Sequence, residues 1–474
     1  MDHLGKYYIG GKWVAPKSDR EMAVLNPASE ERIGTIFLAS EADVDDAVAA
    51  ARAAFETYSR TSRDERMALL ERLMAATLDR FEDLAQAISR EMGAPITMAR
   101  GAQADAGTGH LQGFIDAMAR LKDRETLANG DVQVREPIGV CGLITPWNWP
   151  INQIALKVVP ALATGCTCVL KPSEHTPLSA MIYAEIVEAA GYPAGVFNLI
   201  HGDGAVAGSR LSAHPDVDMV SFTGSTRAGK LISKAAADTI KRVTLELGGK
   251  SPNLVFADCD LEERVTASVN ECMFNTGQSC DAPTRLLVEE SCYDEAVDIA
   301  RRAGEAVTVG DPQEEGDHIG PLFDEIQYRR VQDLIEAGIA EGARLLVGGP
   351  GKPEGRNAGW FCKPTIFADV SNDMRIAREE IFGPVLSIIP FRDEEAAIAI
   401  ANDTPYGLAA YLQTGDRERA ERVAARLRAG AIHINGGGFN YGSPFGGYKQ
   451  SGNGREGGLL GLEDYQEVKT LHFG

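Results

Sequence analysis

Apolar residues between positions 62 and 95 recur with the period of an α-helix. Ser62 and Glu65 stand three residues apart, the spacing of a capping box at a helix N-terminus. The apolar positions that follow, three or four residues apart, form one helix face that would be buried. They are Met67, Leu70, Leu73, Met74, Leu78, Phe81, Leu84 and Ile88. The pattern predicts a helical segment that ends at the Gly-Ala-Pro sequence of residues 93–95.

Residues 138–256 change to short β-branched runs that alternate with helical stretches. The runs typical of strands are 140–145, 166–172, 196–202, 219–224 and 242–249. The stretches with helical periodicity between them are 151–164, 177–190, 204–213 and 226–238. This alternation predicts parallel strands joined by right-handed crossovers, which form an open α/β sheet.

A second α/β pattern occupies the C-terminal half of the chain. Its helical stretches are 293–307, 324–342 and 394–402, and its strand-like runs are 286–290, 345–349 and 385–390. A chain of 474 residues exceeds what one hydrophobic core supports, so two or three domains are expected. The glycine-rich segment 434–458 is too long for an ordinary connector, which predicts a functional loop or a close-packing segment.

The charge of the chain excludes two classes of partner. Its 47 basic and 68 acidic residues give a net charge of −21, which opposes binding to nucleic acid and to anionic membranes. The N-terminal sequence lacks the charged and apolar regions of a signal peptide, and no run of 18 apolar residues occurs. We therefore expect a cytoplasmic protein.

The cysteines predict free thiols, one of them reactive. Eight cysteines in so long a chain without a signal peptide indicate reduced thiols. Cys166 and Cys168 would point to one face of a strand, but no matching Cys or His pair occurs, so we expect no metal site. Cys280 lies between Ser279 and Asp281, near the junction of the two α/β patterns. These polar neighbours favour a reactive thiol over a structural one.

Two strand ends carry residues that suit a dinucleotide. Gly224 permits close backbone approach, and Ser225 can offer a hydroxyl to a phosphate, although an ordinary capped turn explains both equally well. Lys171 and Glu174 end the neighbouring strand. An acid there binds ribose hydroxyls and repels the extra phosphate of NADP, which favours NAD. The alternative is a solvated Lys and Glu on the surface.

Seven motifs occur together in one order: PWNWP (146–150), KPSE (171–174), FTGST (222–226), LELGGKSP (245–252), GQSC (277–280), EEIFGPV (379–385) and SPFGGYKQSG (443–452). With these motifs the chain resembles the aldehyde dehydrogenase superfamily over nearly its whole length. The resemblance implies an α/β fold with a Rossmann-like NAD-binding domain (1–117 and 138–248) and an α/β catalytic domain (249–449). It also implies a small β-flap (118–137 and 450–474) that joins subunits into homodimers or homotetramers.

The resemblance also implies roles for individual residues. Cys280 matches the nucleophile, Glu246 the general base and Asn148 the oxyanion donor. The expected cofactor is NAD, with NADP as the alternative. Its predicted contacts are Thr145, Pro146, Trp147, Lys171, Ser173, Glu174, Gly204, Phe222, Gly224, Ser225, Gly229, Leu247, Glu380 and Phe382.

These residue types suit oxidation of an aldehyde to a carboxylic acid. A thiolate adds to the aldehyde carbon, the adduct loses hydride to leave a thioester, and a carboxylate activates the water that hydrolyses it. One alternative is a CoA-acylating enzyme, which usually lacks the base; another is a catalytically silent scaffold. A third, a cysteine hydrolase, requires a histidine partner such as His201 or His433.

Asp281 departs from the family pattern, in which a neutral residue commonly follows the nucleophile. A carboxylate at this position disfavours anionic aldehydes such as short semialdehydes. Segment 436–444 also lacks any Arg or Lys that would receive a substrate carboxylate. We therefore expect a neutral or aromatic aldehyde. Its predicted pocket consists of Trp149, Asp281, Phe439, Tyr441 and Phe445.

Overall fold

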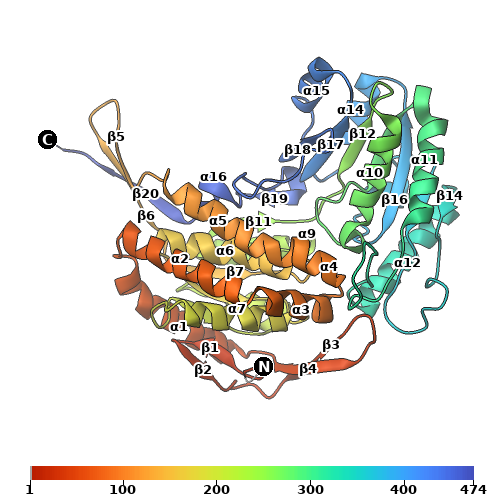
Figure 1. Cartoon of the computed structure of the whole chain (residues 1–474). Helices are drawn as coiled ribbons and strands as arrows, with labels where there is room; N and C mark the ends of the chain where they lie inside the picture. Colours follow the sequence, from red (N-terminus) through yellow and green to blue (C-terminus); the bar gives the residue numbers. More distant parts are fainter. Residues whose placement is uncertain (1–2, 474) are drawn as a thin grey trace.

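Two mostly parallel sheets with helices packed around them form the protein (Figure 1). The computed structural model describes residues 3–473; residues 1, 2 and 474, at the ends of the expected domain segments, lie outside the described residues. The N-terminal unit contains an eight-stranded sheet in the order β19-β11-β10-β7-β8-β9-β1-β2. The bounds are β1 Tyr7–Ile9, β2 Lys12–Val14, β7 Val140–Ile144, β8 Thr167–Lys171, β9 Phe197–Leu199, β10 Met219–Thr223, β11 Arg242–Glu246 and β19 Gly452–Asn453.

The central strands of this sheet confirm the open α/β sheet that the sequence predicts. Strands β7 to β11 are parallel, and each lies within the range expected for it. The connecting helices also match the expected stretches. They are α6 Pro150–Thr164, α7 Pro177–Ala189, the π-helical turn η2 Gly204–Gly208 with α8 Ser209–Ala213, and α9 Thr226–Ala236. The carboxyl ends of β7, β10 and β11 therefore lie side by side at one edge of the sheet.

The helical pattern of residues 62–95 forms two helices. Ser62 and Glu65 make the predicted capping box at the start of α2 (Arg63–Asp79). Arg80 then leaves the helical region, with φ −107° and ψ 13°, and α3 (Phe81–Met92) begins after it. The break turns the apolar face of α3 toward α7 and the π-helix η1 (Ala99–Ala104), whereas α2 also packs on α5 (Asp105–Met118). Gly93, in a left-handed conformation, ends α3.

The C-terminal unit confirms the second α/β pattern. Its seven-stranded sheet has the order β14-β15-β16-β13-β12-β17-β18. The strands are β12 Pro252–Val255, β13 Arg285–Glu289, β14 Arg344–Val347, β15 Thr365–Ala368, β16 Val385–Phe391, β17 Ala409–Gln413 and β18 Ala431–Ile434. The helices are α10 Leu261–Met273, α11 Tyr293–Ala306, α12 Glu325–Ala340, α13 Arg375–Arg378, α14 Glu394–Asn402 and α15 Arg417–Ala424.

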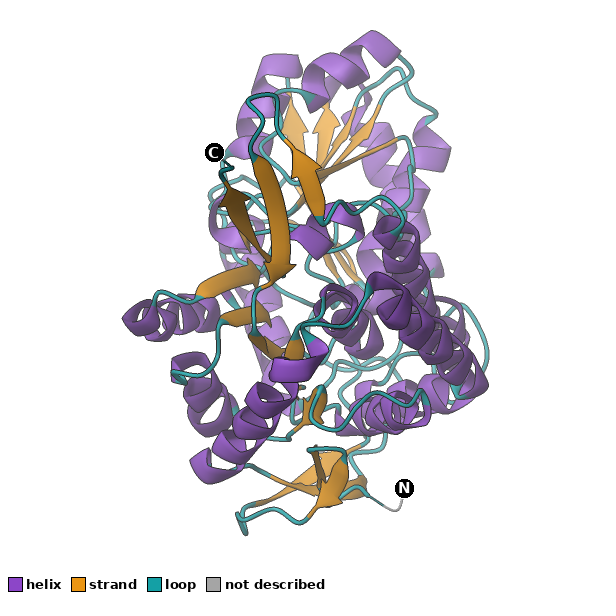
Figure 2. Ribbon diagram, turned by 90° about the vertical axis from the view of Figure 1, so that its left-hand side faces the viewer, coloured by secondary structure: helices purple, strands orange, loops and turns teal. Residues whose placement is uncertain are grey.

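Two small sheets complete the fold. One consists of β3 (Glu21–Leu25) and β4 (Arg32–Phe37); the other has the order β20-β6-β5 and projects from the body in Figure 1. Its strands are β5 Arg124–Thr126, β6 Val132–Pro137 and β20 Gln466–Leu471. Strand β20 lies far from the N-terminal end of the chain (Figure 2). No helix within residues 3–473 is long and apolar enough to cross a membrane.

The glycine-rich segment returns from the C-terminal unit to the N-terminal unit. After β18 it contributes β19, which pairs antiparallel with β11, and it leads into α16 (Gly458–Glu463), which packs on α5 and α6. Of the C-terminal segment that was expected to form the flap, only β20 joins the three-stranded sheet. The glycine-rich segment therefore connects the two units beside the end of β11.

Candidate active site

Cys280 lies between two cavities. The first, which we call the strand-end cavity, has a volume of about 190 Å³ and is bounded by the carboxyl ends of β7, β10 and β11. The second, which we call the aromatic cavity, has a volume of about 260 Å³ and is lined by the predicted substrate residues. Cys280 lines both cavities. A thiol in this position can react with a molecule that enters from one side while a second molecule occupies the other.

Close backbone packing fixes the segment that carries Cys280. Asn275 and Thr276 have left-handed φ angles of 52° and 58°, which non-glycine residues seldom adopt. Gly277 follows with φ 69°, and a β-carbon there would stand 2.1 Å from the Gly383 carbonyl oxygen. Such strained backbone is retained where the surrounding packing determines it, often at functional sites.

The surroundings of Cys280 keep its thiol protonated in the free protein. Burial is the main cause that raises the pKa of Cys280 well above its ordinary value. The negative charges of Asp281, Glu246 and Glu380 raise the pKa further. A hydrogen bond from the backbone N–H of Cys280 acts in the opposite direction and lowers this pKa, because it stabilises the thiolate.

Glu246 ends β11 with its carboxyl group buried beside the strand-end cavity. The residue is 3% exposed, and its Oε1 has no hydrogen-bond partner in the described part of the chain. Burial, and after it the charge of Glu456, raise the pKa of Glu246 well above the ordinary range. Glu456 forms a buried ion pair with Lys157. Because β19 covers β11, Glu246 does not lie on a sheet edge.

Asn148 follows β7 and is held to the Cys280 segment by hydrogen bonds. Its Nδ2 donates to the carbonyl of Gln278 at 3.0 Å. Its own carbonyl accepts from Gln103 Nε2 and from Asn275 Nδ2, both at 3.0 Å. Sequence reasoning missed Gln103 and Asn275, because nothing in their local sequence marks a contact across more than 40 residues.

Half of the predicted cofactor residues line the strand-end cavity. They are Pro146, Trp147, Gly224, Ser225, Leu247, Glu380 and Phe382. Glu380 Oε1 accepts from the Gly249 N–H at 3.1 Å, and burial raises the pKa of Glu380 to about 6. Ser225 caps α9 by accepting from the Ala228 N–H at 3.3 Å. The capped turn that the sequence offered as the alternative to a phosphate contact is therefore present.

The other predicted cofactor residues lie outside the lining of this cavity. Lys171 donates to two carbonyl oxygens and approaches Glu174 Oε2 at 3.3 Å. Phe222 is a core residue whose ring lies against Gly224, and Gly229 packs closely on Leu247. Thr145 and Ser173 are buried, and Gly204 is exposed at the start of η2.

Sequence reasoning missed two residues that support Glu380 and Phe382. Gln327 donates to the Phe382 carbonyl at 2.8 Å, and Arg330 donates to the Glu380 carbonyl at 2.7 Å. Both come from α12 and line the strand-end cavity. Phe382 itself has φ 59° and contacts Trp147 edge to face, with ring centroids 5.5 Å apart. The C-terminal unit thus supplies one wall of the cavity.

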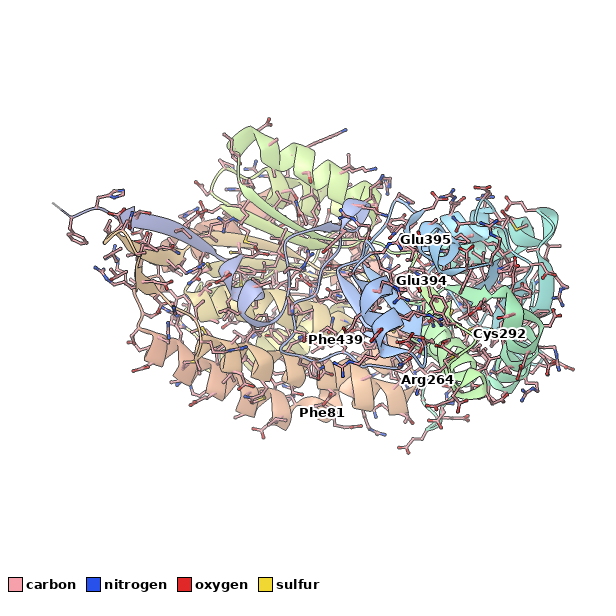
Figure 3. The ribbon with its side chains drawn as sticks, turned by 90° about the horizontal axis from the view of Figure 1, so that it is seen from above. Phe81, Arg264, Cys292, Glu394, Glu395 and Phe439 are labelled. Atoms are coloured by element: carbon pink, nitrogen blue, oxygen red, sulfur yellow. The ribbon has the colours of Figure 1, made fainter. Side chains whose placement is uncertain are left out.

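All five predicted substrate residues line the aromatic cavity. Trp149 Nε1 donates to Ser279 Oγ at 2.9 Å, and Phe439 and Phe445 pack edge to face at 5.9 Å. Phe439 lies between the two units in the view from above (Figure 3). The cavity also includes residues that the sequence did not mark, among them Ala102, His110, Glu271, Phe274 and Tyr411.

Neither candidate histidine has Cys280 as a hydrogen-bond partner among residues 3–473. His201 is fully buried, with its Nε2 3.0 Å from Met181 Sδ. His433 bonds through Nδ1 to the Gly437 carbonyl at 2.8 Å and stacks on Tyr411. Neither lines a cavity that contains Cys280. Within residues 3–473 no cluster of three or more side chains suits a metal ion.

Two α/β units, with one cysteine that lines a cavity on either side, indicate the class of protein to which this chain belongs. The sequence matches the aldehyde dehydrogenase family over residues 13–471, and the chain belongs to this family. It is 54% identical to a Pseudomonas protein named 3-succinoylsemialdehyde-pyridine dehydrogenase, over 99% of both chains. A Pseudomonas syringae aldehyde dehydrogenase variant, solved with NAD+ and octanal, is 50% identical with a TM-score of 0.98, covering 99% of this chain and 97% of that one. A Bartonella henselae aldehyde dehydrogenase is also 50% identical, with a TM-score of 0.97 and 98% of each chain covered.

Proposed function

We propose that this protein oxidises an aldehyde to a carboxylic acid with NAD+, using Cys280, Glu246 and Asn148. The observation that carries the proposal is the position of Cys280, which lines both the strand-end cavity and the aromatic cavity. Glu246 and Asn148 line the first of these cavities with it. A cofactor in one cavity and an aldehyde in the other would meet at the sulfur.

The residues fit a dinucleotide in the strand-end cavity. The carboxyl ends of parallel strands are the usual place for one, and the N-terminus of α9 suits a pyrophosphate. Trp147 and Phe382 offer aromatic walls. The hydroxyl groups of Thr145 and Thr223 are buried without partners among residues 3–473. When bound, NAD+ supplies the hydride acceptor; aldehyde dehydrogenases similar to this chain have been solved with NAD+.

The chain's own residues carry the remaining chemistry. The Cys280 thiol gives up its proton to solvent, the thiolate adds to the aldehyde carbon, and the Asn148 amide with the Cys280 N–H stabilises the oxyanion. Loss of hydride leaves a thioester on Cys280. Glu246 then takes a proton from water, whose oxygen attacks the thioester, and the acid departs as the thiolate is restored. A buried carboxylate with a raised pKa suits the role of base.

The aromatic cavity favours an uncharged aldehyde. Its lining contains two carboxylates, Glu271 and Asp281, and no Lys or Arg among the described residues. An anionic substrate would therefore meet like charge without a compensating cation. The octanal of the P. syringae structure and the pyridine in the name of the Pseudomonas relative are consistent with this preference.

We infer a role in assembly for the sheet of β5, β6 and β20. Strand β20 lies at its edge, and Val468 is 54% exposed there. An exposed edge with an apolar side chain favours pairing with another chain. We therefore expect homodimers or homotetramers, which size-exclusion chromatography with light scattering would distinguish.

The test of the proposed function is NADH formation at neutral pH with NAD+ and a panel of aliphatic, aromatic and semialdehyde substrates. Wild type should produce NADH without CoA, and Cys280→Ala should not. A requirement for CoA would favour an acylating enzyme. Binding of NAD+ without NADH from any aldehyde would favour a silent scaffold.

A further inference from the structure

A third cavity adjoins the aromatic cavity on the other side of Phe274. We call it the outer groove; its volume is about 710 Å³, and it lies between η1 and α4 (Ile96–Met98) of the N-terminal unit and α10 of the C-terminal unit. Phe274 and Ala102 line both the outer groove and the aromatic cavity, and they are the two described residues that do so. One aromatic ring and one methyl group therefore stand between the two spaces.

Small residues of η1 create the space of the outer groove. The π-helical turn carries Gly101 and Ala102 on the groove. A β-carbon at Gly101 would meet no atom within 4 Å, so the space beside it is open. π-helical turns recur at functional sites, because they displace a helix from regular packing.

The lining of the outer groove suits an uncharged, flexible chain. Its larger apolar residues are Pro95, Met98, Met273, Phe274, Val307 and Ile319, and the uncharged polar residues Thr97, Asn270, Asn275, Thr276 and Thr308 line it as well. Among the described residues that line it there is no Lys or Arg, and Asp317 is the carboxylate. Methionine side chains adapt to ligands of varied shape. Phe274 is 46% exposed, and covering this ring would remove apolar surface from water.

We propose that the outer groove holds the far end of the substrate, so that the substrates of this protein include aldehydes with long, uncharged tails. The inference rests on the proposed function, because it places the aldehyde carbon at Cys280. The tail runs through the aromatic cavity and passes Phe274. Phe274, whose ring lies 6.0 Å from that of Trp149, then contacts the middle of the chain and determines which tails reach the groove.

The first measurement is kcat/KM for unbranched aldehydes from butanal to decanal. Each methylene group that becomes buried raises kcat/KM by up to about fourfold. Gly101→Phe fills the outer groove but does not touch the aromatic cavity, whose lining lacks residue 101. This variant should keep kcat/KM for butanal within about twofold and lower it for decanal by tenfold or more.

A matched control separates filling of the groove from the effect of a new aromatic residue. Ala75 is exposed on α2 and distant in sequence from η1, so Ala75→Phe should leave the whole chain-length profile unchanged. Gly101→Phe removes a helical glycine whose β-carbon position is free, so we expect the variant to fold. The same profile in Gly101→Phe and wild type would overturn the inference.

A second readout needs no turnover. 1-Decanol, which carries the same tail without the aldehyde, should raise the Tm of wild type and of Ala75→Phe, but raise that of Gly101→Phe much less. An equal rise in all three proteins would overturn the inference. A different result is that no aldehyde gives NADH, while decanol still raises the Tm of wild type and of Ala75→Phe but not that of Gly101→Phe. The proposed function would then fail, and the outer groove would remain a binding site.

Discussion

The main-chain carbonyl of Cys280 rests against the α-carbon of Gly249, so that a β-carbon at residue 249 would stand 2.2 Å from that oxygen. A backbone oxygen cannot rotate away as a side chain does. Any larger residue at position 249 must therefore displace the segment that carries the thiol. The contact connects the end of β11, which holds Glu246, to Cys280.

Gly249→Ala should therefore reduce turnover more than it reduces stability. A displacement of the thiol of about 1 Å lowers kcat on the order of 100-fold. NADH formation and thermal unfolding would be measured in parallel. Gly438→Ala is the control, since its β-carbon would meet nothing within 4 Å. A kcat for Gly249→Ala close to that of wild type would show that the segment can move without cost.

Glu246→Gln should stabilise the fold while it slows turnover. The folded-state pKa of Glu246 is raised by burial, so ionisation of this group lowers the stability of the fold as the pH rises above its unfolded pKa of about 4.3. A neutral amide carries no such penalty. By calorimetry, the gain in Tm over wild type should be larger at pH 8 than at pH 5, and kcat should fall by roughly 10²- to 10⁴-fold. Equal gains at both pH values would contradict the assignment of a raised pKa.

Glu174→Gln should narrow the preference for NAD over NADP. Glu174 Oε2 lies 3.3 Å from Lys171 Nζ, and a carboxylate at the end of β8 repels a second phosphate. Replacing it with an amide should shift the ratio of the two kcat/KM values on the order of tenfold toward NADP. Both cofactors would be compared with one aldehyde. An unchanged ratio would remove Glu174 from cofactor selection.

Asp281→Asn should improve the oxidation of anionic aldehydes. The Asp281 carboxylate lines the aromatic cavity, and its loss removes a negative charge beside Cys280 that repels an anionic substrate. We expect kcat/KM for succinic semialdehyde to rise relative to benzaldehyde. Burial raises the pKa of Asp281, so the discrimination by wild type should weaken as the pH falls and the carboxylate is protonated. A higher kcat/KM of wild type for succinic semialdehyde than for benzaldehyde would exclude this role of Asp281.

The predictable parts of the structure are those where local pattern and burial agree. Strands β7 to β10 are buried on both faces, so their apolar runs stand out from the helices between them. The break at Arg80 carries neither Gly nor Pro, and the helical period continues through it. Strand β19 has two residues in a glycine-rich segment, so no periodicity could reveal it.

The candidate site divides in the same way. Cys280 and Glu246 lie in sequence motifs that mark them. Tyr441 is instead held by a residue 336 positions away, because its hydroxyl donates to Asp105 Oδ2 at 2.9 Å. A signal for this contact does exist. Gly109 and Gly113 lie four residues apart on α5, and a β-carbon at either would collide with Tyr441 at 2.2 and 2.5 Å. Two glycines on one helix face can indicate that another segment packs there.

The pairing of β19 with β11 has a consequence for how the chain is synthesised. The strand that carries Glu246 leaves the ribosome about 200 residues before its partner Gly452. Until then β11 is an open edge, which can pair with the same edge of another nascent chain. The last part of translation therefore covers the open edge of the first unit, and we expect a chain that stops short of Gly452 to aggregate more readily than the full chain.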